Sequence, residues 1–333
     1  MICNSQRTAE KFLAVSLLLL SLTCEARIGI EFQMPLGNPS NANTDSNNHE
    51  HYLIQRSVFA LDYDDREAEP NWVSWDLTAE DIGSAKRTPT FHPDPELPAS
   101  FHHIMSADYK GSGFDRGHMC PSADRTDNAQ DNDAVFTMAN IIPQAADNNQ
   151  GVWEHLEADC RDWAKQGNEL LIICGPAGFN GEHINQNGPV LVPAHTWKIV
   201  VVVPNGPGSV LSRITKATRV LAVNIPNQAG VRHDPWSKYL LSVSQLEALT
   251  GLKFFTALAP ETAAVLKAKV DSQATQQIAF TSVEPVKALS SSGNSSPSQP
   301  KIDWVPIAIC VVVFLLILTI IVLIIFFRSR PKH

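Results

Sequence analysis

The sequence predicts an α+β domain with a mixed or antiparallel sheet, followed by one C-terminal transmembrane helix. Several short apolar runs have the length and composition of strands. Only three stretches have helical periodicity, which favours the α+β class. The third observation is an uncharged apolar segment at 304–327, long enough to cross roughly 30 Å of hydrocarbon.

Residues 1–26 have the pattern of a secretory signal peptide. Arg7 and Lys11 precede an apolar run from Phe12 to Leu22, which is short for a membrane span. Cleavage is expected after Ala26. Cys24 also allows a lipoprotein interpretation, although the residues before it match a lipoprotein box poorly.

The predicted domain spans 51–285, after an extended N-terminal segment at 27–50. Strands are expected at 57–63, 72–77, 134–139, 169–174, 197–203 and 218–225. Helices are expected at 151–166, before Gly251, and at 260–270. Ser244 and Glu247 form a possible capping box for the second helix.

Beyond the domain, the composition predicts a tether to a membrane. Residues 286–303 are rich in Ser, Gly, Asn and Pro, typical of a flexible stalk. The apolar segment 304–327 begins at Trp304, and the basic tail 328–333 follows it. By the positive-inside rule the tail is cytoplasmic and the domain extracytoplasmic, either periplasmic or extracellular. A buried core helix is the alternative, but a uniformly apolar segment argues against it.

The charge of the chain restricts how it could bind nucleic acid. The formal net charge is −8, and removing the three positive charges of Arg328, Arg330 and Lys332 leaves about −11. Any affinity for nucleic acid must therefore come from a local basic cluster.

Three polar segments are candidates for a catalytic site. The first is Asp115-Arg116-Gly117-His118, which combines a guanidinium fork suited to phosphate with an imidazole suited to proton transfer. The second runs from Asn140 to Gln144, and the third is Asn148-Asn149-Gln150, with Glu157 two helical turns later. A strand–strand–helix order would bring these segments together around phosphodiester chemistry.

These motifs resemble the DNA/RNA non-specific endonuclease family, which has a ββα-metal (His-Me finger) active site. The resemblance covers roughly residues 35–282. Asn149 lies nine residues after Asn140, and Glu157 lies eight after Asn149, in the family's order. The resemblance implies an endonuclease that hydrolyses DNA and RNA with one Mg²⁺, with Mn²⁺ as a possible substitute.

The resemblance also implies roles for individual residues. His118 is the general base that takes a proton from the attacking water, and Asn140 orients the site around it. Asn149 is the direct metal ligand, and Glu157 holds metal-bound water.

Three arginines are candidates for binding the substrate. The family pattern implies that Arg116 and Arg87 contact the phosphate. Arg125, next to Asp124, could line the same groove or form a salt bridge within a turn.

Three of the six cysteines fall in the predicted domain: Cys120, Cys160 and Cys174. In an oxidising compartment we expect one disulfide and one buried thiol. Cys174 lies in a strand-like apolar run, so the expected disulfide joins Cys120 to Cys160.

Other interpretations of the same motifs stay open. His102 and His103 could be a metal pair, but adjacent positions without a helical i, i+4 partner favour a structural or surface role. The domain could act as a phosphodiesterase on a non-polynucleotide substrate. It could also be a catalytically inactive module that binds nucleic acid.

Overall fold

Seven strands form one antiparallel sheet in this computed structural model, which describes residues 33–272 except 89 and 186–187. The spatial order is β1-β2-β3-β6-β7-β8-β9, and each neighbouring pair is antiparallel. The strands are β1 (Tyr52–Gln55), β2 (Ala60–Asp64), β3 (Glu69–Leu77), β6 (Asn168–His183), β7 (Leu191–Pro204), β8 (Arg219–Pro226) and β9 (Leu240–Leu241). The predicted α+β class is confirmed for the described residues.

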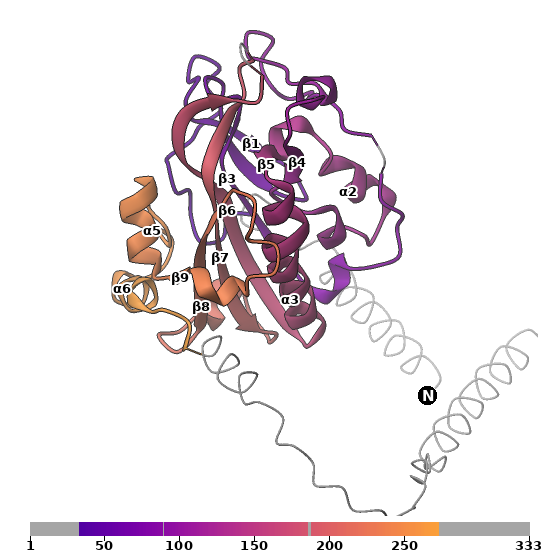
Figure 1. The fold of residues 1–333 in the computed structure, drawn as a ribbon. Helices are drawn as coiled ribbons and strands as arrows, with labels where there is room; N and C mark the ends of the chain where they lie inside the picture. Colours follow the sequence, from indigo (N-terminus) through magenta and orange to yellow (C-terminus); the bar gives the residue numbers. More distant parts are fainter. Residues whose placement is uncertain (1–32, 89, 186–187, 273–333) are drawn as a thin grey trace, which may run out of the picture. The chain divides into compact units, whose positions relative to one another are not determined.

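The central strands are covered on both faces (Figure 1). In β6, Leu170 and Ile172 pack in the same apolar cluster as Leu156 of α3 (Glu154–Lys165). Leu171 and Ile173 point to the opposite face, which α5 (Val243–Thr250) and α6 (Pro260–Ala268) cover. Because strand side chains alternate between faces, a strand buried on both sides needs apolar residues at every position.

A second, two-stranded sheet pairs β4 (Asp115–His118) with β5 (Ile141–Gln144). His118 lies opposite Ile141, and Gly117 lies opposite Ile142. A Cβ on Gly117 would lie 2.0 Å from the Gln144 side chain, so this position requires glycine. After β5 the chain enters a π-helical turn (Asn148–Trp153) and then α3, which completes a β–β–α unit.

The predicted strand at 134–139 is wrong. That segment contains the end of α2 (Ala129–Ala134) and a 3-10 turn (Met138–Asn140). The Asn128 side chain accepts a hydrogen bond from the Asp131 amide at 2.8 Å, which caps α2. An apolar run of this length has no periodicity that separates a buried turn from a strand.

The capping box of α5 lies two residues earlier than predicted. Ser242 Oγ accepts a hydrogen bond from the Gln245 amide, and Gln245 Oε1 accepts one from the Ser242 amide. The helix ends as predicted at Gly251, which adopts the left-handed conformation. The remaining helices are α4 (Val210–Arg213) and 3-10 turns at Ala79–Asp81, Ser106–Tyr109, Ser122–Asp124 and Trp236–Tyr239.

The expected disulfide is also wrong, because Cys120, Cys160 and Cys174 are free, buried thiols. All three belong to the apolar cluster beneath α3. Burial raises the pKa of Cys160 to about 12, which leaves little of the reactive thiolate at neutral pH. Their role in the structure is packing.

The N-terminal segment packs on the domain from residue 33 onward. Leu36 and Ala42 are buried beside the sheet, although residues 33–50 contain no regular helix or strand. Residues 1–26, 286–303, 304–327 and 328–333 lie outside the described residues, and so do the predictions made for them. Between residues 33 and 272, no helix has the length and hydropathy needed to cross a membrane.

Candidate active site

The His118 ring lies against two phenylalanines. Its centroid is 5.2 Å from that of Phe91 and 4.8 Å from that of Phe136. The guanidinium carbon of Arg116 lies 4.7 Å from the Phe91 ring centre, and that of Arg87 lies 4.9 Å from the Phe136 ring centre. The structure therefore brings His118, Arg116 and Arg87 together, although Arg87 comes from a separate loop.

His118 has the electrostatics of a neutral base. The residue is 7% exposed, and its Nε2 has no hydrogen-bond partner. Burial, followed by the positive charges of Arg87 and Arg116, lowers the pKa of His118 to about 3. At neutral pH the imidazole is thus uncharged, and one of its two ring nitrogens can accept a proton.

Arg87 and Arg116 differ from every other arginine of the described residues, because no carboxylate pairs with them. The other arginines all form ion pairs: Arg56, Arg66, Arg125, Arg161, Arg213, Arg219 and Arg232. Arg116 donates only to the hydroxyl and carbonyl oxygens of Ser106. Both guanidinium groups are exposed and available to an anionic ligand.

A cleft of about 550 Å³ opens beside Arg116. It is lined by the 3-10 turn at Ser106–Tyr109, by Lys110 and by the start of β4. This cleft adjoins the strand that carries His118, so a ligand held by Arg116 can extend away from the imidazole.

Asn149 lies in the π-helical turn, with its amide orientation set by Asp115. Asn149 Nδ2 donates to Asp115 Oδ2 at 2.9 Å, and Gln150 Nε2 donates to the same oxygen at 2.7 Å. An ionised carboxylate only accepts hydrogen bonds, so the Asn149 nitrogen must face it and Oδ1 must face away. That oxygen is a hard ligand of the type that Mg²⁺ takes.

The donor set suits a metal ion that keeps most of its own water. In the described part of the chain, no group of three or more His, Cys, Asp or Glu side chains could hold a metal ion. One neutral amide oxygen fits Mg²⁺, which dehydrates reluctantly and uses few protein ligands. The Asn149 geometry is therefore compatible with the implied ion.

Glu157 is buried in α3, and its Oε1 lies 3.5 Å from Lys198 Nζ. Burial raises the pKa of Glu157 to about 7, against the opposing charge of Lys198. Lys198 itself is buried in β7, 4.0 Å from the Trp153 ring centre. Although Arg87 is exposed, partial burial lowers the pKa of its guanidinium. The negative charge of Glu157 opposes that shift, which places Glu157 near the same site.

Asn140 is fully buried and acts on the backbone next to the site. Its Nδ2 donates to the carbonyls of Cys120 and Val135, and its Oδ1 accepts from the Cys120 amide. These bonds, each 2.9 Å, fix the chain two residues beyond His118. Asn140 can therefore orient the base, while no polar atom of its amide is left for substrate.

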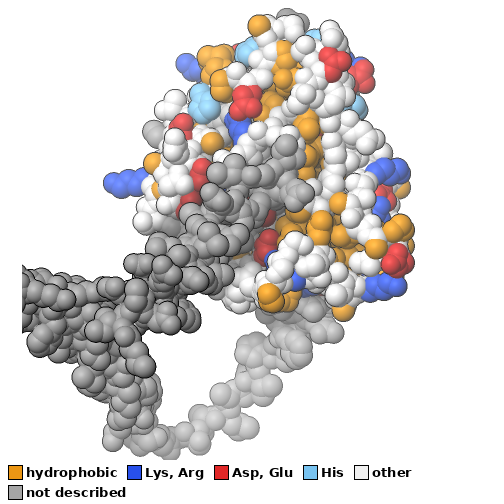
Figure 2. Space-filling view, turned by 180° about the vertical axis from the view of Figure 1, so that it is seen from behind, with side chains coloured by type: hydrophobic (Ala, Val, Ile, Leu, Met, Phe, Trp, Pro, Cys, Tyr) orange, Lys and Arg blue, Asp and Glu red, His pale blue; other side chains and the backbone are white. Residues whose placement is uncertain are grey.

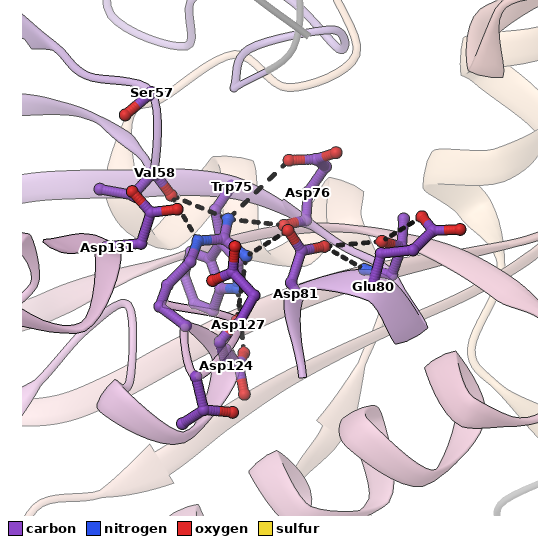
Figure 3. A network of polar contacts seen from close by, with 12 residues as sticks. Ser57, Val58, Trp75, Asp76, Glu80, Asp81, Asp124, Asp127 and Asp131 are labelled. Atoms are coloured by element: carbon purple, nitrogen blue, oxygen red, sulfur yellow. Dashed lines mark hydrogen bonds and ion pairs between the residues drawn. The ribbon is translucent and has the colours of Figure 1, made fainter. Parts of the chain in front are cut away.

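Arg125 does not line a groove, contrary to one of the two interpretations of its motif. It is 2% exposed, and its guanidinium donates to the carbonyls of Val58, Asp124 and Asp76. Ion pairs to Asp76 and Asp81 surround it. Figure 3 shows these acidic residues and Val58 converging on one point of the interior. Arg125 is a structural residue that joins three segments.

The two adjacent histidines also have local partners. His102 Nδ1 lies 3.0 Å from Asp65 Oδ1, and His103 Nε2 lies 3.1 Å from the Pro98 carbonyl oxygen. The structural or surface interpretation fits these contacts.

Several residues of the site were not predicted from the sequence. Phe91 and Phe136, which flank the imidazole, carry no polar signal in the sequence. Lys198 could have been found, because a lysine within the apolar run Trp197–Val203 predicts a buried charge with a partner. Asp115 was visible in the motif, but its bond to Asn149 depends on the fold.

Comparisons with known proteins show the family and the fold of this chain. The sequence model of the DNA/RNA non-specific endonuclease family matches residues 36–261. A nuclease of Nostoc sp. is 44% identical over 73% of this chain and 87% of its own length. The mitochondrial nuclease EXOG of Mus musculus is 31% identical over 60% of this chain, which spans only 55% of that protein. A solved structure of the EndoG/EndoGI complex contains a chain with the same fold, at a TM-score of 0.57 and 24% identity, covering 69% of this chain and 92% of that one. This chain belongs to the DNA/RNA non-specific endonuclease family.

Proposed function

We propose that this chain is a Mg²⁺-dependent endonuclease that hydrolyses phosphodiester bonds of DNA and RNA, with His118 as the general base. One observation carries the proposal. The only described arginines without a carboxylate partner are Arg87 and Arg116, and they flank a neutral, buried imidazole whose Nε2 has no partner. A phosphodiester would supply the missing negative charge.

Each residue has a defined task in this mechanism. The His118 imidazole accepts the proton of the attacking water, since burial keeps it uncharged at neutral pH. Arg116 and Arg87 bind the phosphate and stabilise the charge that builds up on its oxygens.

Asn149 Oδ1, together with Glu157 acting through water, would hold Mg²⁺ or Mn²⁺. The bound ion supplies positive charge to the phosphate and the departing oxygen. Asp115 keeps the Asn149 oxygen turned outward by accepting its amide hydrogens.

The proposed partners are DNA and RNA, recognised mainly through their backbone. Contacts to phosphate carry no sequence information, so cleavage should depend weakly on sequence. On the face seen in Figure 2, acidic and basic side chains are interspersed, with no broad basic field. Because the net charge of the chain is −8, binding would rely on the local cluster around Arg87 and Arg116.

We also propose that the domain is anchored to a membrane and lies on its extracytoplasmic side. The support is in the sequence, where segment 1–26 resembles a signal peptide and segment 304–327 resembles a membrane span. Protease protection of a C-terminal tag in sealed membranes, with the domain itself digested from outside, is the expected result. A digested tag with a protected domain would contradict the topology.

A phosphodiesterase acting on a small substrate is the second candidate, favoured by the net charge of −8. The full chain should be assayed on circular DNA, on RNA and on bis(p-nitrophenyl) phosphate, with Mg²⁺ and with excess chelator. We expect cleavage of both polymers, loss of cleavage with chelator, and loss in Asn149→Ala. Turnover of the small ester with both polymers left intact would favour the second candidate and overturn the first.

A further inference from the structure

The loop after β8, residues Asn227–Asp234, makes several hydrogen bonds to Ala145–Gly151, the turn that carries Asn149. The guanidinium of Arg232 reaches three acceptors there. Its Nε lies 2.9 Å from Asp147 Oδ1, its Nη2 donates to the Ala146 carbonyl at 3.2 Å, and its Nη1 donates to the Gln150 carbonyl at 3.2 Å. These acceptors lie on both sides of Asn149 in the chain.

The backbones of the loop and the turn are also in close contact. The Gly230 amide donates to Asp147 Oδ2 at 2.7 Å. A Cβ on Gly151 would lie 2.6 Å from the Cα of Arg232, so only glycine allows this approach. Gly151 has φ −134° and ψ −111°, outside the helical region, and it interrupts the helix at this contact.

Asn227 ties down the other end of the turn. It is 8% exposed, and its Oδ1 accepts from the Ala145 amide at 2.7 Å. Its Nδ2 donates to the carbonyls of Pro143 and Pro193, both at 2.9 Å. The turn is thus linked at its start to β5 and β7, and along its length to Arg232.

The turn needs such support because its own hydrogen bonding is irregular. π-helical turns are rare and are found frequently at functional sites. Asp115 fixes the amide orientation of Asn149, but it does not hold the backbone from 146 to 151 in place. In metal sites, removing a residue that orients a ligand typically costs about 10- to 100-fold in metal affinity.

We propose that Arg232 is a positioning residue for metal binding, which holds the turn Ala145–Gly151 so that Asn149 presents its oxygen to the ion. The inference rests on the proposed function, in which Asn149 is the ligand. Arg232 then sets the metal affinity from more than 80 positions downstream of Asn149. In the described structure it contacts neither His118 nor the phosphate-binding arginines.

The test is a titration of the full chain with Mn²⁺. The electron paramagnetic resonance signal of the free ion measures how much Mn²⁺ is bound. Arg232→Gln should weaken binding about 10- to 100-fold. Arg232→Lys should recover part of the affinity, since an ammonium can pair with Asp147 but cannot reach all three acceptors. Arg219→Gln is the matched control, because Arg219 also pairs with an aspartate, Asp271, at 2.8 Å, but among the described residues it forms no hydrogen bond or ion pair with the turn. Its Mn²⁺ affinity should stay within about twofold of wild type.

Equal Mn²⁺ affinities for wild type and Arg232→Gln would overturn the inference, and so would an equal loss in Arg219→Gln. Asn149→Ala separates the two proposals. If Asn149→Ala loses binding and Arg232→Gln does not, only this inference fails. If Asn149→Ala binds like wild type, the proposed metal site fails and the inference fails with it. Should Arg232→Gln not fold, Asp147→Asn removes the same ion pair from the turn, and retained affinity there is equally contradictory.

Discussion

Arg116 and Arg125 lie nine positions apart, yet they have opposite surroundings. Arg125 is 2% exposed, and carbonyls and carboxylates occupy its donors. Arg116 is exposed, stacks on Phe91 and pairs with no carboxylate. The difference teaches that an arginine's partners, more than its place in a motif, decide whether it serves the fold or a ligand.

The same contrast separates the site from the interior behind it. There, Asp124 pairs with Arg161, and Arg125 pairs with Asp76. A buried pair is costly to break, because the remaining charge is left without compensation. At the site, the guanidinium groups of Arg87 and Arg116 have no carboxylate partner. This costs little free energy, because water can solvate them.

The largest expected effect on stability is that of replacing the buried Arg125. Arg125→Met removes the donors to Val58, Asp76 and Asp124 and leaves their oxygens unpaired in the interior. The free energy of unfolding should fall by about 3–5 kcal/mol. Denaturant unfolding measures it, and a loss below about 1 kcal/mol would mean that Arg125 is not needed for the fold.

Substitution of Arg116 should change the activity and leave the stability unchanged. Arg116→Ala should lower the turnover rate on DNA about 10²- to 10³-fold, because a preorganised positive charge at the phosphate is lost. Its unfolding free energy should match that of wild type within about 0.5 kcal/mol, since Arg116 is exposed. Comparable losses of stability in Arg116→Ala and Arg125→Met would erase the distinction.

Glu69 extends the comparison to a buried acid without a cation. It is fully buried, both carboxylate oxygens lack a hydrogen-bond partner, and burial raises its pKa well above the usual value. The folded state then keeps a proton that the unfolded chain releases above about pH 4.5, so stability should fall as pH rises from there, by up to about 1.4 kcal/mol per pH unit.

Glu69→Gln should remove this contribution to the pH dependence of the unfolding free energy. Unfolding free energies of both proteins between pH 5 and pH 8 measure the difference. Identical slopes would show that the Glu69 carboxyl does not hold its proton.

The smallest effect should come from a surface pair. Arg66 and Glu50 are both largely exposed, with Nη1 and Oε1 2.9 Å apart. Arg66→Gln should change the unfolding free energy by no more than about 1 kcal/mol and leave nuclease activity intact. A loss as large as that of Arg125→Met would indicate that exposure does not predict the role of these arginines.

Sequence reasoning worked where a local pattern reflects the final environment. The apolar run 169–174 predicted a strand buried on both faces. The order of the polar segments predicted that Asp115–His118 lies beside the start of a helix, where Asp115 contacts Asn149. It failed where the outcome depends on distant segments. The role of Arg125 is decided by Val58, 67 positions away, and the support of the Asn149 turn comes from Arg232. The strand expected at 134–139 became a helix end and a turn because an apolar run alone does not specify which buried structure it forms.

The most direct test of the account is the rate at which His118→Ala nicks circular DNA with Mg²⁺, compared with wild type. His118 is the only group to which the account assigns proton removal from water, a contribution typically worth about 10²- to 10⁴-fold. We predict a loss of that size, with the melting temperature close to that of wild type. A folded His118→Ala protein that nicks DNA at the wild-type rate would contradict the account.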